Sequence, residues 1–143
     1  MTGIIFSILA GICMSFQGVF NTRLSEKIGT WETNVVVQAS GMLLTIIILL
    51  IFGNGHFKEI KNVNKLYLLG GVLGVIIIFS VVEGISKMGP TYSIATILVA
   101  QLTAAAIIDA FGLFGAEKLI FSQSKIIGVA VMILGIVIFK WKG

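Results

Sequence analysis

The sequence predicts an all-α membrane protein with five transmembrane helices in each chain. Of its 143 residues, 57% are hydrophobic and only 11% are charged, and the mean hydropathy is +1.10. A soluble domain of this length carries about a quarter charged residues, so the composition excludes an ordinary water-soluble protein. It also excludes a disordered chain, which needs low hydrophobicity and high charge.

Five apolar segments are long enough to cross a bilayer. A helix needs about 20 mostly apolar residues for this, because lipid cannot satisfy an open backbone. The predicted helices run from Gly3 to Asn21, from Thr33 to Phe52, from Leu66 to Ile85, from Tyr92 to Phe114 and from Ile126 to Phe139. Together they form one predicted domain over residues 1–143.

The segments between the helices are short, with one exception. Residues 53–65 form the only long polar connection, and its lysines keep it in water. Gly89 and Pro90 join the third and fourth helices, where glycine permits a turn and proline opens the next helix, so we expect a tight antiparallel hairpin. Residues 122–125 supply the opening turn of the fifth helix, and Trp141 with the lysines beside it anchors the far end.

The basic residues divide evenly between the two sides of the membrane. With five spans, the two sets are Lys58, Lys61, Lys65, Lys118 and Lys125 against Arg23, Lys27, Lys87, Lys140 and Lys142. Lys and Arg stay on the cytoplasmic side, so a five-to-five division indicates no orientation. Either the connection at residues 53–65 decides the topology, or the chain inserts both ways and pairs as an antiparallel homodimer.

Small residues recur at helical spacing in four of the predicted helices. They allow close backbone approach, which membrane helices need in the absence of a hydrophobic drive between them. The candidates for helix packing are Gly11, Ser15 and Gly18, then Gly70 and Gly74, and finally Gly128 and Gly135, and Ala100, Ala104 and Ala105 line part of the fourth helix. Such faces fit packing within one subunit as well as a dimer seam.

Two acidic residues fall within the predicted spans. A charge at membrane depth costs about 2.5–3.5 kcal/mol on insertion scales, so it usually has a partner or a function. Glu83 can pair with Lys87 one turn later, or it can contribute to coupling. Asp109 is either a structural group near the interface or a binding site for a proton or a cationic substrate.

Uncharged polar residues extend this candidate site. Gln101, Ala105, Ile108 and Asp109 share one face of the fourth helix, given a period of 3.6 residues. Gln17 and Asn21 share a face of the first. These side chains either line a polar cavity or hydrogen-bond neighbouring helices, a contact worth about 1 kcal/mol.

Other function classes have no support in the sequence. The basic residues are scattered, so we expect no nucleic-acid partner. No catalytic or phosphate-binding motif occurs, and the single cysteine, Cys13, provides neither a disulfide framework nor a cysteine metal site. We expect no enzyme activity, no metal and no cofactor.

Several segments resemble a known family of membrane proteins. Residues 115–119, GAEKL, and the glycine-spaced helix that follows are similar to the closing segment of the drug/metabolite transporter (DMT) superfamily. Residues 17–24, QGVFNTRL, resemble the Q-x-x-x-N-x-x-L pattern of its YdcZ-like branch. Gln101 with residues 107–115, IIDAFGLFG, resembles the GQ…IDHFG signature of the same branch, with Ala100 and Ala110 departing from it.

The resemblance implies a bacterial inner-membrane protein with an EmrE-like bundle. Members of this branch occur as single genes, as oppositely oriented pairs and as fused proteins, which implies an antiparallel homodimer, or a heterodimer with a homologous chain. The expected function is transport of a small metabolite or organic cation by alternating access. The alternatives are a passive channel for a small solute and a non-transporting subunit that packs with a partner protein.

Overall fold

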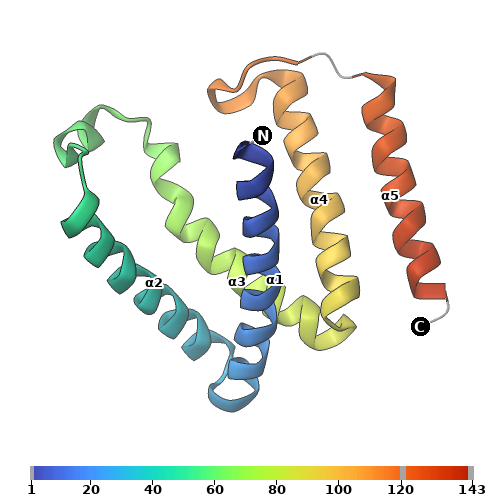
Figure 1. Ribbon diagram of the computed structural model, residues 1–143, viewed down its shortest axis with the longest axis horizontal. Coiled ribbons are helices and arrows are strands. Elements are labelled where there is room, and N and C mark those ends of the chain that lie inside the picture. The colour runs from blue at the N-terminus through green and yellow to red at the C-terminus, as the bar shows by residue number, and fades with distance from the viewer. Residues whose placement is uncertain (1, 120–121, 142–143) are drawn as a thin grey trace. The chain divides into compact units, whose positions relative to one another are not determined.

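The computed structural model describes residues 2–119 and 122–141, and every regular element among them is helical (Figure 1). Five helices of the described residues are long and apolar enough to cross a membrane, as predicted. They are α1 (Thr2–Ile28), α2 (Thr30–Phe52), α3 (Gly70–Met88), α4 (Pro90–Phe111) and α5 (Gln123–Trp141). Lys142, counted above as a basic residue and an anchor, lies outside the described residues.

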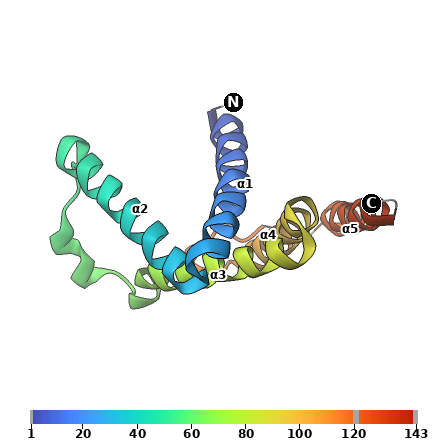
Figure 2. The same cartoon turned by 90° about the horizontal axis from the view of Figure 1, so that it is seen from below.

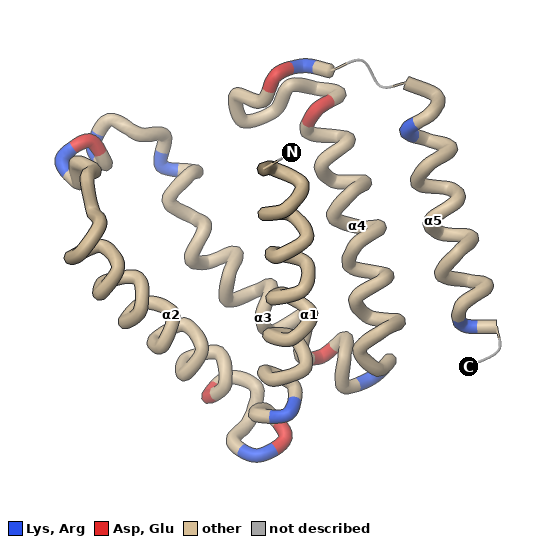
Figure 3. The backbone as a smooth tube through the Cα atoms, in the orientation of Figure 1, with Lys and Arg blue, Asp and Glu red and all other residues tan. Residues whose placement is uncertain are grey.

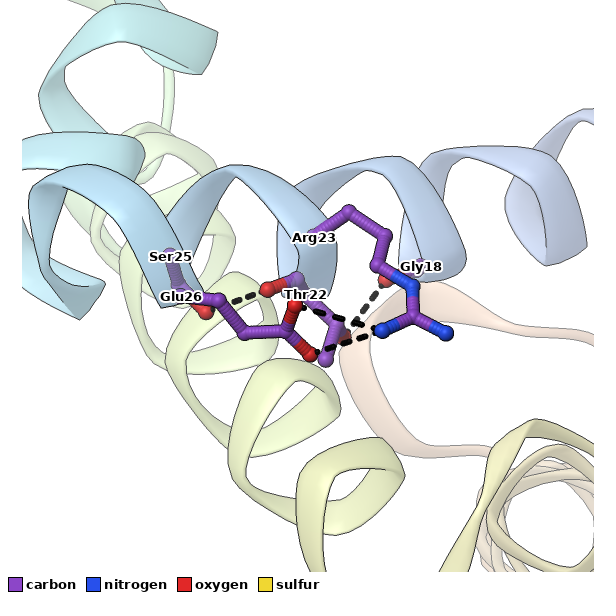
Figure 4. Close-up of polar contacts among 5 residues, drawn as sticks. All are labelled: Gly18, Thr22, Arg23, Ser25 and Glu26. Atoms are coloured by element: carbon purple, nitrogen blue, oxygen red, sulfur yellow. Dashed lines mark hydrogen bonds and ion pairs between the residues drawn. The ribbon is translucent and has the colours of Figure 1, made fainter.

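The first helix is longer than predicted. α1 continues past Asn21 to Ile28, and the chain turns only at Gly29, whose φ is 98°. Within this extension the hydroxyls of Thr22 and Ser25 donate to main-chain carbonyls of α1, and Arg23 pairs with Glu26 at 3.1 Å (Figure 4). The residues that follow Asn21 in α1 are largely polar, and the Arg23–Glu26 pair at i,i+3 spacing supports the helix there. Hydropathy alone therefore placed the end of α1 too early.

The fourth helix ends earlier than predicted, at Phe111 instead of Phe114. Gly112 has a left-handed backbone with φ of 62°, and its N–H donates to the carbonyl of Asp109. Glycine is the usual residue in this helix-ending conformation. A short 3₁₀ helix, η3 (Leu113–Gly115), follows.

The ends of the remaining helices agree with the predictions to within a few residues. Gly89, with φ of 78°, precedes α4, and Pro90 is its first residue, which confirms the predicted roles of both. The polar connection contains η1 (Phe57–Asn62) and η2 (Lys65–Leu69), so α3 itself begins at Gly70. α5 begins at Gln123 and continues to Trp141, two residues beyond the predicted end.

The chain divides into two compact units, residues 1–87 and 88–143. In the first unit, α1 and α2 splay apart from their short connection, as Figures 1 and 2 both show. Among its described residues, the buried apolar side chains are those of Ile78, Val82 and Ile85 in α3. Most other apolar side chains of this unit are exposed, which is expected of helices that face lipid.

The second unit contains α4, η3 and α5. α4 and α5 lie side by side and run antiparallel, since Asp109 near the end of α4 is close to Lys125 at the start of α5. At the other end, the Lys140 ammonium lies 4.6 Å from the centre of the Tyr92 ring. In both units charged residues gather near helix ends and in the connections (Figure 3).

Candidate functional site

Asp109 lies at the charged end of a groove between α4 and α5. The groove has a volume of about 400 Å³, and Asp109 and Lys125 supply its charges. A carboxylate oxygen of Asp109 lies 3.9 Å from the Lys125 ammonium nitrogen. Apolar or small residues complete the lining: Leu102, Ala105, Ala106, Gly128, Val129 and Met132. A charged pair at the end of an apolar groove can orient a small molecule that has both polar and apolar parts.

The loop after α4 fixes the position of this charged end. The Asp109 carbonyl accepts hydrogen bonds from the N–H groups of Gly112 and Leu119, at 3.4 and 2.9 Å. The chain therefore folds back over the last turn of α4. Lys125 is in the first turn of α5, where its N–H donates to the Ser122 carbonyl.

Gln101 does not join Asp109 in this groove. Ala105, one turn after Gln101, does line it, as the helical period predicts, but Gln101 itself is exposed and is not among the lining residues that the structure describes. Only part of the polar face predicted for α4 therefore lines the groove.

The other predicted polar residues lie in the first unit. Asn21 of α1 is buried, with 6% of its surface exposed, whereas Gln17 one turn earlier is exposed. Their shared face, predicted from the spacing, is therefore only half buried. Glu83 is half-buried in α3, and its carboxylate lies 2.9 Å from the Lys87 ammonium nitrogen, so the predicted ion pair is confirmed.

Four polar residues of α1 and α2 are buried, and of these the sequence indicated only Asn21. They are Asn21 and Thr22 of α1 and Thr33 and Asn34 of α2, and each is 6% exposed or less. The Asn34 amide donates a hydrogen bond to the carbonyl of Val75 in α3 at 2.8 Å. The fully buried Thr33 hydroxyl has no hydrogen-bond partner within the described part of the chain.

The small residues proposed for packing differ in their surroundings. A Cβ on Gly18 would lie 2.8 Å from Ile85 Cδ1, and one on Gly74 would lie 3.0 Å from the amide nitrogen of Gln38, so both glycines allow close contact within the first unit. Ser15 donates to the carbonyl of its own helix at Gly11. The positions with open space around an added Cβ are Gly11, Gly70, Gly128 and Gly135.

The sequence reasoning missed Lys125 as a site residue. Lys125 was counted with the basic residues of a connection, because it lies at the boundary of an apolar run. Its position in the first turn of the fifth helix was a usable signal, since an antiparallel neighbour brings that turn to the end of α4. Asn34 lies one residue after the predicted start of a mostly apolar helix, and hydropathy gives no signal that its side chain is buried.

A family model described as "Putative inner membrane exporter, YdcZ" matches residues 2–138. No curated protein and no solved structure matches the chain. The match covers the segments that carry the resemblance found in the sequence, and the family is one of transporters and not of enzymes. With its five candidate spans, the chain is an inner-membrane protein. It belongs to the YdcZ family of the DMT superfamily.

Proposed function

We propose that this protein exports a small metabolite or organic cation from the cell by alternating access. The observation that carries the proposal is the Asp109 carboxylate at the charged end of an otherwise apolar groove. Charged groups within membrane helices are costly, and they commonly mark the path of a substrate or a coupling ion. The description of the family as an exporter supports the direction.

The proposed working form is a dimer of oppositely inserted chains. The even division of the basic residues supports insertion in both directions. Two copies of one fold in opposite orientations can exchange conformations, and so expose the same site to either side of the membrane. We propose that the two compact units of each chain work together as a single five-helix domain.

In this dimer, Asp109 binds the substrate or coupling ion. Gln101, Gln17 and Asn21 provide further polar lining, and Glu83 contributes to coupling. The exposed side chains of Gln101 and Gln17 leave their amides available to a second chain. Gly128 and Gly135, with open space on α5, allow the close approach of a neighbouring helix.

Counterflow into proteoliposomes tests the proposal. Liposomes loaded with unlabelled solute are diluted into a trace of the labelled solute. A carrier that alternates between two states accumulates label transiently, whereas a channel only equilibrates it. Flux without trans-stimulation would indicate a channel, and a purified protein that moves none of the solutes would indicate a subunit that needs a partner. Either result contradicts alternating access by this chain alone.

Topology mapping tests whether the chain inserts in both orientations, as the proposed dimer requires. The exposed Cys13 is the single cysteine, so Cys13→Ser gives a cysteine-free background for new cysteines in the exposed connection at residues 53–65. A membrane-impermeant thiol reagent should label about half of these cysteines from each side of the membrane. Labelling from one side only contradicts dual insertion.

A further inference from the structure

We propose that the charged end of the α4–α5 groove binds a small zwitterion, with the ligand's ammonium at Asp109 and its carboxylate at Lys125. The apolar part of the ligand lies along Leu102, Ala105 and Met132. This inference rests on the proposed transport function and narrows its substrate class. It adds Lys125, which the sequence did not indicate, as a residue that determines specificity.

The Asp109–Lys125 pair retains unused hydrogen-bonding capacity. At 3.9 Å, the two groups attract each other but are too far apart for a direct hydrogen bond. A carboxylate offers two acceptor oxygens and an ammonium three donors, and the two side chains are 40% and 35% exposed. A ligand with both charges can therefore approach both residues without displacing either.

The two helix ends favour the same orientation of the ligand. Asp109 is in the last turn of α4, where the helix dipole favours a cation, and Lys125 is in the first turn of α5, where the dipole favours an anion. Each residue thus lies at the helix end that disfavours its own charge, so stabilisation of its helix does not explain it. A ligand ammonium near Asp109 and a ligand carboxylate near Lys125 would each meet a favourable helix end as well as an opposite charge.

The rest of the groove suits a small ligand with an apolar body. Its volume of about 400 Å³ is toward the lower end for ligand pockets, which are about 300–1,000 Å³. Ala105, Ala106 and Gly128 leave space close to the two backbones.

Ligands with a single charge fit this arrangement less well. A monocation at Asp109 would stand beside the Lys125 ammonium, and a monoanion at Lys125 would stand beside the Asp109 carboxylate. Each would lie next to a like charge, and like-charge repulsion disfavours its binding. A zwitterion instead completes a neutral set of four alternating charges.

Binding to the purified, full-length protein tests this inference with matched probes. The zwitterions are leucine, methionine and phenylalanine, and each is compared with the amine that lacks its carboxylate and the acid that lacks its amine. Hydrogen bonds to charged groups have energies that correspond to about tenfold or more in affinity. The wild type should therefore bind each zwitterion at least about tenfold more tightly than either of its analogues.

The variants separate the two charges. Lys125→Gln should abolish the preference for zwitterion over amine, whereas Lys125→Arg, which keeps the charge, should retain it. Asp109→Asn should abolish the preference for zwitterion over acid. Lys140→Gln, at the far end of α5, is the matched control and should bind as the wild type does. Size-exclusion chromatography and helical content confirm that each variant is folded.

Three results would overturn the inference: no zwitterion of the set binds to the wild type, the amines bind as tightly as the zwitterions, or Lys125→Gln keeps the wild-type preference. Flux assays on the same proteins separate it from the proposed function. Zwitterion binding without any flux contradicts transport alone. If the protein transports the amines, and Lys125→Gln does not change its preference for zwitterion over amine, the zwitterion inference is contradicted and the transport function is not.

Discussion

The side-chain amide of Asn34 in α2 donates a hydrogen bond to the main-chain carbonyl of Val75 in α3 at 2.8 Å. Asn34 is 3% exposed, and Gln38, one turn further along α2, lies against Gly74 of α3. Two amides one turn apart thus meet consecutive residues of α3. They fix the register of α2 against α3, although most of the surface of α2 is apolar.

Replacing Asn34 with leucine should destabilise the protein. Interhelical hydrogen bonds in membrane proteins contribute about 0.6–1.7 kcal/mol, so Asn34→Leu should lower the thermal unfolding midpoint in detergent. Ser40→Ala is the control, because Ser40 is exposed and its hydroxyl donates to the Val37 carbonyl of its own helix. Equal midpoints for the two variants would contradict a structural role for the Asn34 bond.

A large side chain at Gly18 should disrupt the contact between α1 and α3. A Cβ there would lie 2.8 Å from Ile85 Cδ1 and 3.1 Å from Val81 Cγ1, and overpacking costs about 1–3 kcal/mol. Gly18→Leu should therefore unfold at a lower temperature than Gly11→Leu, since Gly11 has open space around it. If Gly11→Leu were the less stable variant, the packing described for α1 would be wrong.

The conformation of Gly112 should determine whether the loop after α4 closes correctly over Asp109. Its φ of 62° disfavours a residue with a Cβ by about 1–2 kcal/mol, and asparagine tolerates this conformation better than most residues. A Cβ there would also lie 3.3 Å from the Ala116 carbonyl oxygen. Gly112→Val should thus lose more thermal stability and flux than Gly112→Asn, and the reverse order would count against this account of the loop.

Two added lysines in the connection at residues 53–65 should fix the orientation of the chain. Asn54→Lys with Gly55→Lys breaks the five-to-five balance, so this connection should stay in the cytoplasm and the C-terminus should face the periplasm. Reporter fusions at the C-terminus measure the outcome, and Asn54→Gln with Gly55→Ser is the neutral control. A single orientation in the control would show that the natural chain is not dual.

The sequence predicted the number and approximate limits of the helices because hydropathy and length alone determine which segments can span a bilayer. It could not predict the extension of α1 to Ile28, because these last residues are largely polar and hydropathy does not detect a polar helical turn. The sequence correctly indicated a turn at Gly89, where proline follows, but not at Gly112, which lies within an apolar run. The left-handed conformation of Gly112 ends α4 at Phe111, before the predicted end.

The sequence predicted those parts of the candidate site that depend on a single helix. Asp109 was recognised because a carboxylate in an apolar run is conspicuous, and Ala105 followed from the helical period. The approach of Lys125 depends on how α5 packs against α4, which no local pattern encodes. Gln101 is exposed and does not line the groove, although the helical period places it on the same face of α4 as Asp109. A shared helical face is therefore not sufficient to predict a lining residue.

Flux through Asp109→Asn in proteoliposomes tests the central claim most directly. The substitution removes the charge while keeping the size of the side chain, and Glu117→Gln, at an exposed position in the following loop, is its matched control. With the amino acids and amines described above as labelled solutes, counterflow should fall by about tenfold or more in Asp109→Asn and stay at the wild-type level in Glu117→Gln. Wild-type counterflow in Asp109→Asn would contradict the assignment of Asp109 as the group that binds the transported solute.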